Sequence, residues 1–151
     1  TLHQFGLIKD TDKYDDYVID EYYERVEDAP NRDQNPLAGV WQIEKSTYGE
    51  KSQTAAESRW KINKIFTNKF WYGTFYDPKT GAFNGVGFGT YVLEGNQYIE
   101  TLEAYSWDQS AVGKTYTFTM DIQANALIQR GKINSDKYKD YTIIEYFKRI
   151  E

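Results

Sequence analysis

Residues 114–123 read KTYTFTMDIQ, the clearest strand pattern in the chain. Tyr116, Phe118, Met120 and Ile122 recur at every second position, and threonine or aspartate stands between them. A period of two places the apolar side chains on one face of a β-strand and the polar ones on the other. The segment therefore predicts a strand with one buried face and one solvated face, as is typical of antiparallel sheets.

Further segments with strand patterns lie on both sides of this one, separated by turn signals. Residues 77–81, DPKTG, place proline and glycine where a β-turn needs them, and residues 94–96, EGN, are typical of a hairpin. The expected strands cover 39–45, 59–66, 69–76, 88–93, 97–107, 114–123, 127–134 and 140–150. Eight antiparallel strands with little helix predict a closed meander or a sandwich. A meander of consecutive hairpins closes most simply as an up-and-down barrel, with room inside for side chains or one small ligand.

Two stretches interrupt this pattern. The polar residues 46–57 predict a long loop at the barrel mouth, which is either a lid or a connection whose length is merely tolerated. Gly85, Gly87 and Gly89 predict a bend or bulge in the sheet. They do not resemble a phosphate-binding loop, because no helix pattern follows them.

The composition excludes several classes of function. The 151 residues include no cysteine, so disulfide scaffolds, zinc-thiolate sites and thiol chemistry are excluded. A single histidine, His3, and a formal net charge of −5 disfavour His-based catalysis and nucleic-acid binding. No apolar run reaches the roughly 20 residues of a membrane helix. We therefore expect no enzyme activity, catalytic residue, metal, cofactor, nucleic acid or membrane insertion.

The chain contains an internal repeat. Residues 11–27, TDKYDDYVIDEYYERVE, and residues 135–151, SDKYKDYTIIEYFKRIE, are identical at ten of seventeen positions. After a slip of one residue the match extends backwards through Ile8, Gly6, Gln4 and Leu2 to Ile133, Gly131, Gln129 and Leu127. Along the last expected strand the identities follow a period of two, which indicates that Tyr141, Ile143 and Glu145 point inward.

We interpret the repeat as part of a tandem array: residues 1–27 are the last hairpin of an upstream repeat, 28–36 a linker, and 37–151 a complete barrel domain. Chance similarity and an extra N-terminal hairpin that packs on the barrel are the alternatives. Because a lone hairpin has unpaired edges, it is also the expected route to a homo-oligomer.

Two features resemble the lipocalins and the wider calycin group: Gly39-Val40-Trp41 on the first strand and Arg149 near the end of the last. Residues 89–91, 98–100 and 145–149, together with Gly113, are similar to small lipocalin-like domains of unknown function in bacterial envelope and secreted proteins. The chain lacks the cysteine pair and the Thr-Asp-Tyr motif of classical lipocalins, so a receptor-recognition role is not implied.

For residues 37–151 the resemblance implies an all-β fold. This fold is an antiparallel, up-and-down, eight-stranded lipocalin-like barrel, to which the repeat adds an extra N-terminal β-hairpin. The resemblance also implies that Trp41 and Arg149 pack together and close one end of the barrel. It implies an extracytoplasmic location, which means periplasmic, cell-envelope or secreted.

Polar and aromatic side chains on the expected strands are the candidate site. Polar groups inside a barrel are costly unless they are paired, so they form either a buried network or a contact for a ligand. The aromatic side chains either fill the core or form walls for a planar ligand. The candidate ligand-binding residues are Trp60, Tyr72, Tyr98, Glu100, Tyr116, Gln129, Tyr141 and Glu145.

These features favour a non-enzymatic binding module that holds a small hydrophobic or amphipathic ligand in the barrel. The main alternative is a structural or interaction domain with a filled barrel and no small-molecule ligand. A third interpretation is an enzyme that uses carboxylates inside the barrel. An aromatic-lined cavity would separate the first interpretation from the second, and the third requires a carboxyl of perturbed pKa in an open cavity.

Overall fold

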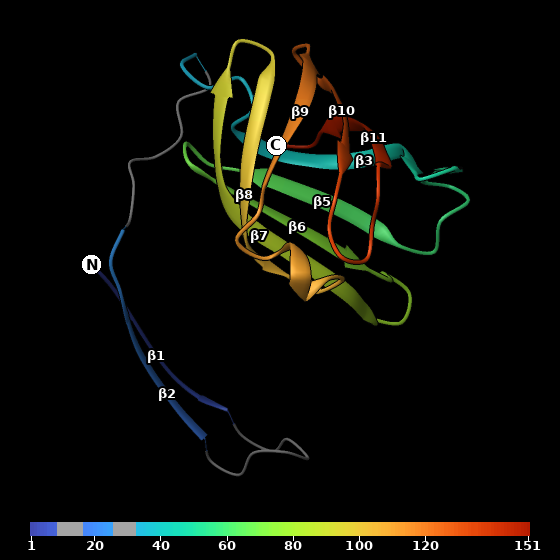
Figure 1. Cartoon of the computed structure of the whole chain (residues 1–151). Coiled ribbons are helices and arrows are strands. Elements are labelled where there is room, and N and C mark those ends of the chain that lie inside the picture. Colours follow the sequence, from blue (N-terminus) through green and yellow to red (C-terminus); the bar gives the residue numbers. More distant parts are fainter. Residues whose placement is uncertain (9–16, 26–32) are drawn as a thin grey trace.

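The computed structural model of the chain describes residues 1–8, 17–25 and 33–151. These residues form a closed antiparallel barrel and a separate two-stranded hairpin (Figure 1). The one helical element in the described part is the 3-10 turn η1, Gln109–Ala111. Within these ranges no helix is both long and apolar enough to span a bilayer.

Eight strands of the barrel pair in chain order, and the last pairs with the first. The strands are β3 (Gly39–Tyr48), β5 (Lys61–Phe66), β6 (Phe70–Tyr76), β7 (Phe83–Glu94), β8 (Gln97–Tyr105), β9 (Thr115–Ile122), β10 (Ala126–Ile133) and β11 (Tyr141–Arg149). β11 runs antiparallel to β3 with Arg149 opposite Trp41, so the eight strands form a closed ring. The predicted up-and-down eight-stranded barrel is confirmed.

Residues 46–57 do not form the long loop expected from the sequence. Strand β3 continues to Tyr48, and β4 (Lys51–Thr54) folds back and pairs with the second half of β3. Gly49 lies in the turn between them at a φ of +63°, a conformation that favours glycine, and a Cβ there would lie 2.8 Å from the Tyr141 ring. A β-hairpin therefore extends one side of the barrel where a lid-like loop was predicted.

One end of the barrel is organised around Trp41, which is fully buried. Its indole Nε1 donates a hydrogen bond of 2.7 Å to the carbonyl oxygen of Leu37, and the Arg149 guanidinium lies 4.1 Å from the ring centre. Arg149 also donates to the backbone oxygens of Pro36 and Ala38, both at 2.6 Å. These contacts tie the segment that leads into β3 to the end of β11.

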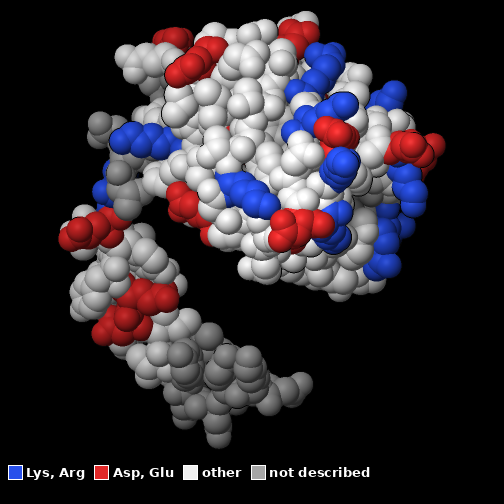
Figure 2. Space-filling model, viewed as in Figure 1, with Lys and Arg blue, Asp and Glu red and all other residues white. Residues whose placement is uncertain are grey.

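The N-terminal hairpin consists of β1 (Leu2–Ile8) and β2 (Tyr17–Tyr23). Among the described residues, its two strands contact each other and no strand of the barrel, and Figure 1 shows the hairpin apart from the barrel. Packing of the hairpin on the barrel, one of the alternatives above, is therefore not observed. Figure 2 shows acidic side chains on the hairpin and both signs of charge interspersed over the barrel.

Part of the predicted domain division falls on residues that the structure does not describe. Residues 11–16, 26 and 27 of the repeat and 28–32 of the expected linker lie outside the described ranges. The origin of residues 1–27 in an upstream repeat stays a prediction.

We expect Trp41→Ala to lower the free energy of unfolding by about 3–5 kcal/mol, the usual cost of deleting a buried tryptophan. Arg149 would lose its ring partner in the same variant. Trp60→Ala is the matched control, because Trp60 is only half-buried and lies outside the core. Urea unfolding measures both, and equal losses would show that Trp41 has no special role in closing the barrel.

We expect deletion of residues 1–32 to leave the barrel folded, because β1 and β2 make no contact with it. The deletion keeps Asn35 and Pro36, whose side-chain and backbone groups bond to the barrel. The melting temperature should stay within about 2 °C of the full chain. Loss of the cooperative thermal transition would show that the hairpin is part of the barrel's core.

Candidate functional site

A cavity of about 220 Å³ lies inside the barrel, and all eight barrel strands contribute to its wall. It occupies the half of the barrel away from Trp41: β3 reaches it with Tyr48, at the opposite end of that strand. The barrel interior is therefore not completely filled by side chains.

The floor of the cavity contains a buried lysine that the sequence analysis did not single out. Lys64 is 7% exposed, and its Nζ donates to Gln129 Oε1 at 3.0 Å and lies 3.5 Å from Glu100 Oε2. The ammonium also lies 4.8 Å from the Trp71 ring centre and 5.0 Å from that of Tyr98. A buried charge is tolerated only when it is paired, and these four side chains provide the partners.

A second carboxyl, that of Glu145, is buried in the same wall. Its Oε1 accepts a 2.6 Å hydrogen bond from the Tyr48 hydroxyl. Burial raises the pKa of Glu145, and the Glu100 charge adds to this shift, while the Lys64 ammonium and the Tyr48 hydrogen bond oppose it. Burial also raises the pKa of Tyr48 well above its usual value, so Tyr48 remains a hydrogen-bond donor at neutral pH.

Aromatic side chains surround the cavity at the end marked by Tyr48, which we call the mouth. The ring centres of Phe75 and Trp107 lie 4.8 Å apart, and those of Tyr138 and Tyr141 lie 4.5 Å apart. The aromatic side chains of the mouth are Tyr48, Phe75, Tyr105, Trp107, Tyr138 and Tyr141. The cavity thus combines an aromatic mouth with a polar, charged floor.

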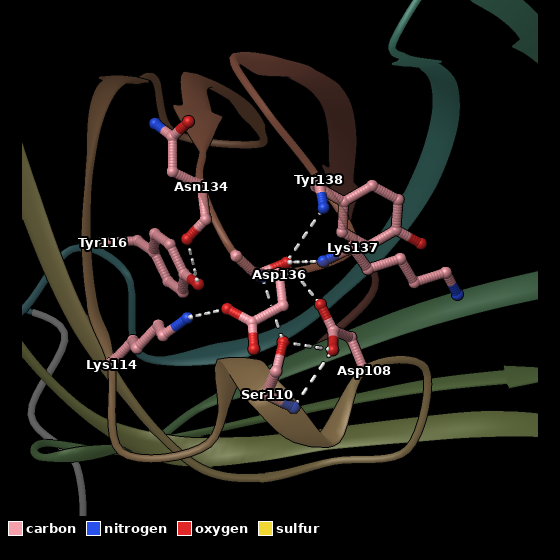
Figure 3. Close-up of polar contacts among 9 residues, drawn as sticks. Asp108, Ser110, Lys114, Tyr116, Asn134, Asp136, Lys137 and Tyr138 are labelled. Atoms are coloured by element: carbon pink, nitrogen blue, oxygen red, sulfur yellow. Dashed lines mark hydrogen bonds and ion pairs between the residues drawn. The ribbon is translucent and has the colours of Figure 1, made fainter.

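Hydrogen bonds join the η1 loop to the β10–β11 turn (Figure 3). These two connections carry Trp107 and Tyr138, which line the mouth. The Asp108 carboxylate accepts from the Ser110 backbone N–H at 3.0 Å and from the Ser135 hydroxyl. The Ser135 oxygen accepts in turn from the Tyr138 backbone N–H at 3.1 Å. We call these hydrogen bonds among Asp108, Ser110, Ser135 and Tyr138 the Asp108 latch. The bond from Ser135, followed by those from Ser110, keeps the pKa of the Asp108 carboxyl below its usual value. Asp108 is therefore ionised at neutral pH and accepts these bonds.

Gly87 and Gly89 make room for Trp71 on the cavity wall. A Cβ on Gly87 would lie 2.7 Å from the Trp71 ring, and a Cβ on Gly89 would clash with the Thr101 carbonyl oxygen. The register of β7 against β8 shifts between Phe88 and Gly89, so the bulge expected in this glycine run is present. The glycines let the Trp71 indole pack directly against the β7 backbone.

The structure brings most of the sequence-predicted site residues to this cavity. The candidates that line it are Glu100, Tyr116, Gln129, Tyr141 and Glu145. Tyr98 is fully buried in the packed core beside the cavity, where its ring contacts Lys64. The inward face predicted for the last strand from the repeat is confirmed, since Tyr141, Ile143 and Glu145 all line the cavity.

Trp60 and Tyr72 do not line the cavity, and their placement inside the barrel was wrong. Tyr72 is 40% exposed on the outer face of β6, because its neighbours Trp71 and Gly73 take the inward positions. Trp60 precedes β5, and the Arg59 guanidinium lies 4.6 Å from its ring centre. An aromatic residue type does not by itself tell which face of a strand a side chain occupies.

A local signal for Lys64 was present in the sequence. In KINKIF, residues 61–66, Ile62 and Phe66 are the inward positions, and Lys64 lies at the alternate position between them. Trp107 and Tyr138, in contrast, lie in connections without any alternation. Tertiary contacts place them at the mouth: the hydrogen bonds of Asp108 and Ser135, and the ring contacts of Trp107 with Phe75 and Tyr105.

The site offers polar and aromatic groups that can contact a ligand. The floor offers an ammonium, an amide and two carboxyl groups, and the mouth offers aromatic rings and tyrosine hydroxyls. In the ranges that the structure describes, no three His, Asp or Glu side chains are grouped so that they could hold a metal ion.

A family model matches residues 36–151, which span the whole barrel, and its description is a domain of unknown function, DUF4488. The chain belongs to this family. No curated protein matches the chain. The matched residues include every side chain of the cavity, so the cavity is a feature of the DUF4488 domain in this protein.

Two solved structures align with the chain over the DUF4488 domain. A lipocalin-like protein from Bacteroides uniformis ATCC 8492 aligns with a TM-score of 0.51 at 18% identity, over 76% of this chain and 98% of that one. An uncharacterized protein from Bacteroides eggerthii DSM 20697 aligns with a TM-score of 0.49 at 17% identity, over 75% and 98% of the two chains. The first similarity shows the fold alone, and it agrees with the lipocalin-like barrel predicted from the sequence.

We expect Glu145→Gln to remove a pH dependence of stability. Because the folded-state pKa of Glu145 is raised, the folded protein keeps this proton in a pH range where the unfolded chain has released it. The stability of the wild type should therefore fall as the pH rises from about 4.3 towards the raised pKa. Glu145→Gln, which retains an acceptor for Tyr48, should not share that fall.

Urea unfolding between about pH 4 and pH 7 measures this difference. Glu103→Gln, at an exposed position of β8, is the matched control. Stability curves of wild type and Glu145→Gln that run parallel over the whole range would contradict the expectation.

Proposed function

We propose that this DUF4488 barrel is a non-enzymatic binding module that holds one small amphipathic molecule in its interior. The observation that supports the proposal is the cavity of about 220 Å³, bounded by aromatic rings at its mouth and by paired polar groups at its floor. A filled barrel, the main alternative, would have side chains in this space. An extracytoplasmic location is part of the proposal and rests on the sequence resemblance alone.

The volume of the cavity restricts the part of the ligand that it can bury. An apolar cavity of about 150 Å³ holds benzene, and this cavity is roughly one and a half times as large. A single ring with substituents, or two fused rings, fits that space. A sterol or a long acyl chain would need a larger cavity.

The polar floor favours an amphipathic ligand over a purely apolar one. An apolar group pressed against Lys64, Glu100 and Glu145 would exclude water without replacing its hydrogen bonds, which is costly. A hydroxyl or amine on the ligand can bond to these groups, while its ring packs among the aromatic side chains of the mouth. A hydroxylated or aminated aromatic compound therefore suits both halves of the cavity.

Glu145 also gives the enzyme alternative its one supporting observation, because a carboxyl of raised pKa in a cavity is a typical general acid. Its carboxyl is engaged by the Tyr48 hydroxyl, and that of Glu100 by the Lys64 ammonium. Binding accounts for all four side chains without a bond-breaking step, and the lipocalin-like fold fits a non-enzyme.

We expect Gly73→Leu to fill the cavity and block binding while the barrel stays folded. Gly73 lines the cavity, and a Cβ there would make ordinary contacts, 3.5 Å from Trp71 and 4.0 Å from the Asn63 carbonyl oxygen. The affinity for a hydroxylated fused-ring probe such as 2-naphthol should fall at least about tenfold, which corresponds to about 1.4 kcal/mol. Titration calorimetry measures the affinity, and a thermal scan checks the fold.

Tyr72→Leu is the matched control, since Tyr72 is the next residue on β6 and faces outward. It should leave the affinity unchanged. Native mass spectrometry of protein purified from its own host then tests for a retained small molecule. Equal affinity of Gly73→Leu and wild type, or a wild type that carries no ligand and binds no small aromatic compound, would overturn the proposed function.

A further inference from the structure

The N-terminal hairpin repeats the closing hairpin β10–β11 in strand pairing as well as in sequence. In both hairpins the repeated residues face the same partners across the two strands. The equivalent cross-strand pairs are Leu2–Tyr23 and Leu127–Phe147, Gln4–Glu21 and Gln129–Glu145, Gly6–Ile19 and Gly131–Ile143, and Ile8–Tyr17 and Ile133–Tyr141. The register of the two hairpins is therefore the same along their whole length.

Identity between the two hairpins is concentrated on the face that points into the barrel. Of the eight residues that these pairs contribute to β10–β11, seven are identical in β1–β2, and Phe147 is replaced by Tyr23. Of the six outward positions that alternate with them, only Tyr146 has an identical counterpart, Tyr22. The residues of β10–β11 that line the cavity are Gln129, Ile133, Tyr141, Ile143, Glu145 and Phe147.

Gly6 is informative because nothing in the hairpin itself requires a glycine there. A Cβ on Gly6 would meet no atom within 4 Å. Its counterpart Gly131 sits against β9, where a Cβ would lie 2.5 Å from the Phe118 ring. Glycine weakens a strand, so a glycine at position 6 needs a reason outside the isolated hairpin. Packing of β1 against a strand equivalent to β9 would supply that reason.

Two apolar residues of the hairpin's inner face, Leu2 and Tyr23, are exposed in the N-terminal hairpin. Leu2 is 62% exposed and Tyr23 is 44% exposed, whereas their counterparts Leu127 and Phe147 are 0% and 2% exposed. A lone two-stranded hairpin is marginally stable in water, and both of its outer edges are unpaired. The inner face and the two edges together are the surface that β10–β11 uses in the barrel.

We propose that β1–β2 is a second closing hairpin, and that its partner is a second copy of this barrel. In that copy β1–β2 takes the place of the copy's own β10–β11, so that β1 pairs with the strand equivalent to β9 and β2 pairs with the strand equivalent to β3. Gln4 and Glu21 then take the places of Gln129 and Glu145, so the second cavity carries the same polar pair. Arg25 takes the place of Arg149. The proposal does not depend on the ligand-binding function.

The barrel of this chain is itself a suitable test partner for the hairpin. The Val40 backbone N–H donates to the Glu151 carbonyl oxygen at 2.9 Å, so the chain beyond β11 lies beside the start of β3. If β1–β2 occupies the place of β10–β11, the end of β2 therefore lies next to the start of β3. Residues 24–38 can join the two strands, because paired strands lie only about 5 Å apart.

The first experiment disables the native closing hairpin in the full chain. Leu127→Asp with Phe147→Asp places two carboxylates at buried, paired positions, where they cannot be accommodated. We expect β1–β2 to take the vacated place, so that this variant keeps a cooperative thermal transition. Leu2→Asp with Tyr23→Asp is the matched control and should keep the wild-type melting temperature. The variant with all four substitutions should lose the transition.

The second experiment detects the exchange directly. Arg130 faces Thr119 across β10 and β9, and Phe5 is the counterpart of Arg130, so Phe5→Cys and Thr119→Cys are adjacent only when β1 lies beside β9. In the background with Asp at 127 and 147 we expect a disulfide between these two cysteines, within one chain or between two. Peptide mass spectrometry identifies it, and Gly6→Val should abolish it.

The two experiments decide the proposal together. A disulfide that depends on Gly6 supports it when Leu127→Asp with Phe147→Asp keeps its cooperative transition. The proposal is overturned if the disulfide does not form, or if Leu127→Asp with Phe147→Asp is as unfolded as the four-substitution variant. Ligand titration plays no part in either readout, so failure here leaves the proposed binding function to its own test.

Discussion

The pairing of β11 with β3 is the constraint on which the rest of the molecule depends, because it turns a meander of hairpins into a closed ring. Arg149 reinforces it at one end, stacking on Trp41 and bonding to the backbone of the segment that enters β3. With eight strands, a closed ring leaves an interior just wide enough for side chains or one small molecule. The cavity exists because the ring closes around it.

Burial of polar groups in the interior of the barrel reduces the stability of the fold. Apolar side chains at the positions of Lys64, Glu100 and Glu145 would avoid the cost of desolvating charges, and such replacements are often neutral or stabilising. The protein instead pairs these groups with one another and with Gln129 and Tyr48. These buried polar groups reduce stability and lie beside the cavity. That arrangement is consistent with recognition of a ligand that carries polar groups of its own.

The closing hairpin supplies much of the cavity wall, and this links the site to the N-terminal hairpin. Glu145 and Gln129 both belong to β10–β11, and β1–β2 carries Glu21 and Gln4 in the same register. The outward residues of the two hairpins differ because solvent tolerates many side chains, whereas the interior restricts both shape and polarity. The same face of the hairpin therefore serves both for closure of the ring and for the site.

The sequence alone determined the eight barrel strands, their order and the closed barrel, because alternation and turn residues are local and antiparallel neighbours need only short connections. It also determined which face of the last strand carries Glu145, since a two-residue period survives in a repeat within one chain. It did not determine β4, which was expected as part of a loop. Only the tertiary structure decided that Tyr72 faces outward and that Trp107 and Tyr138 form the mouth. The physical reason is that these positions depend on contacts between segments far apart in the chain, such as the Asp108 latch, which leave no local pattern.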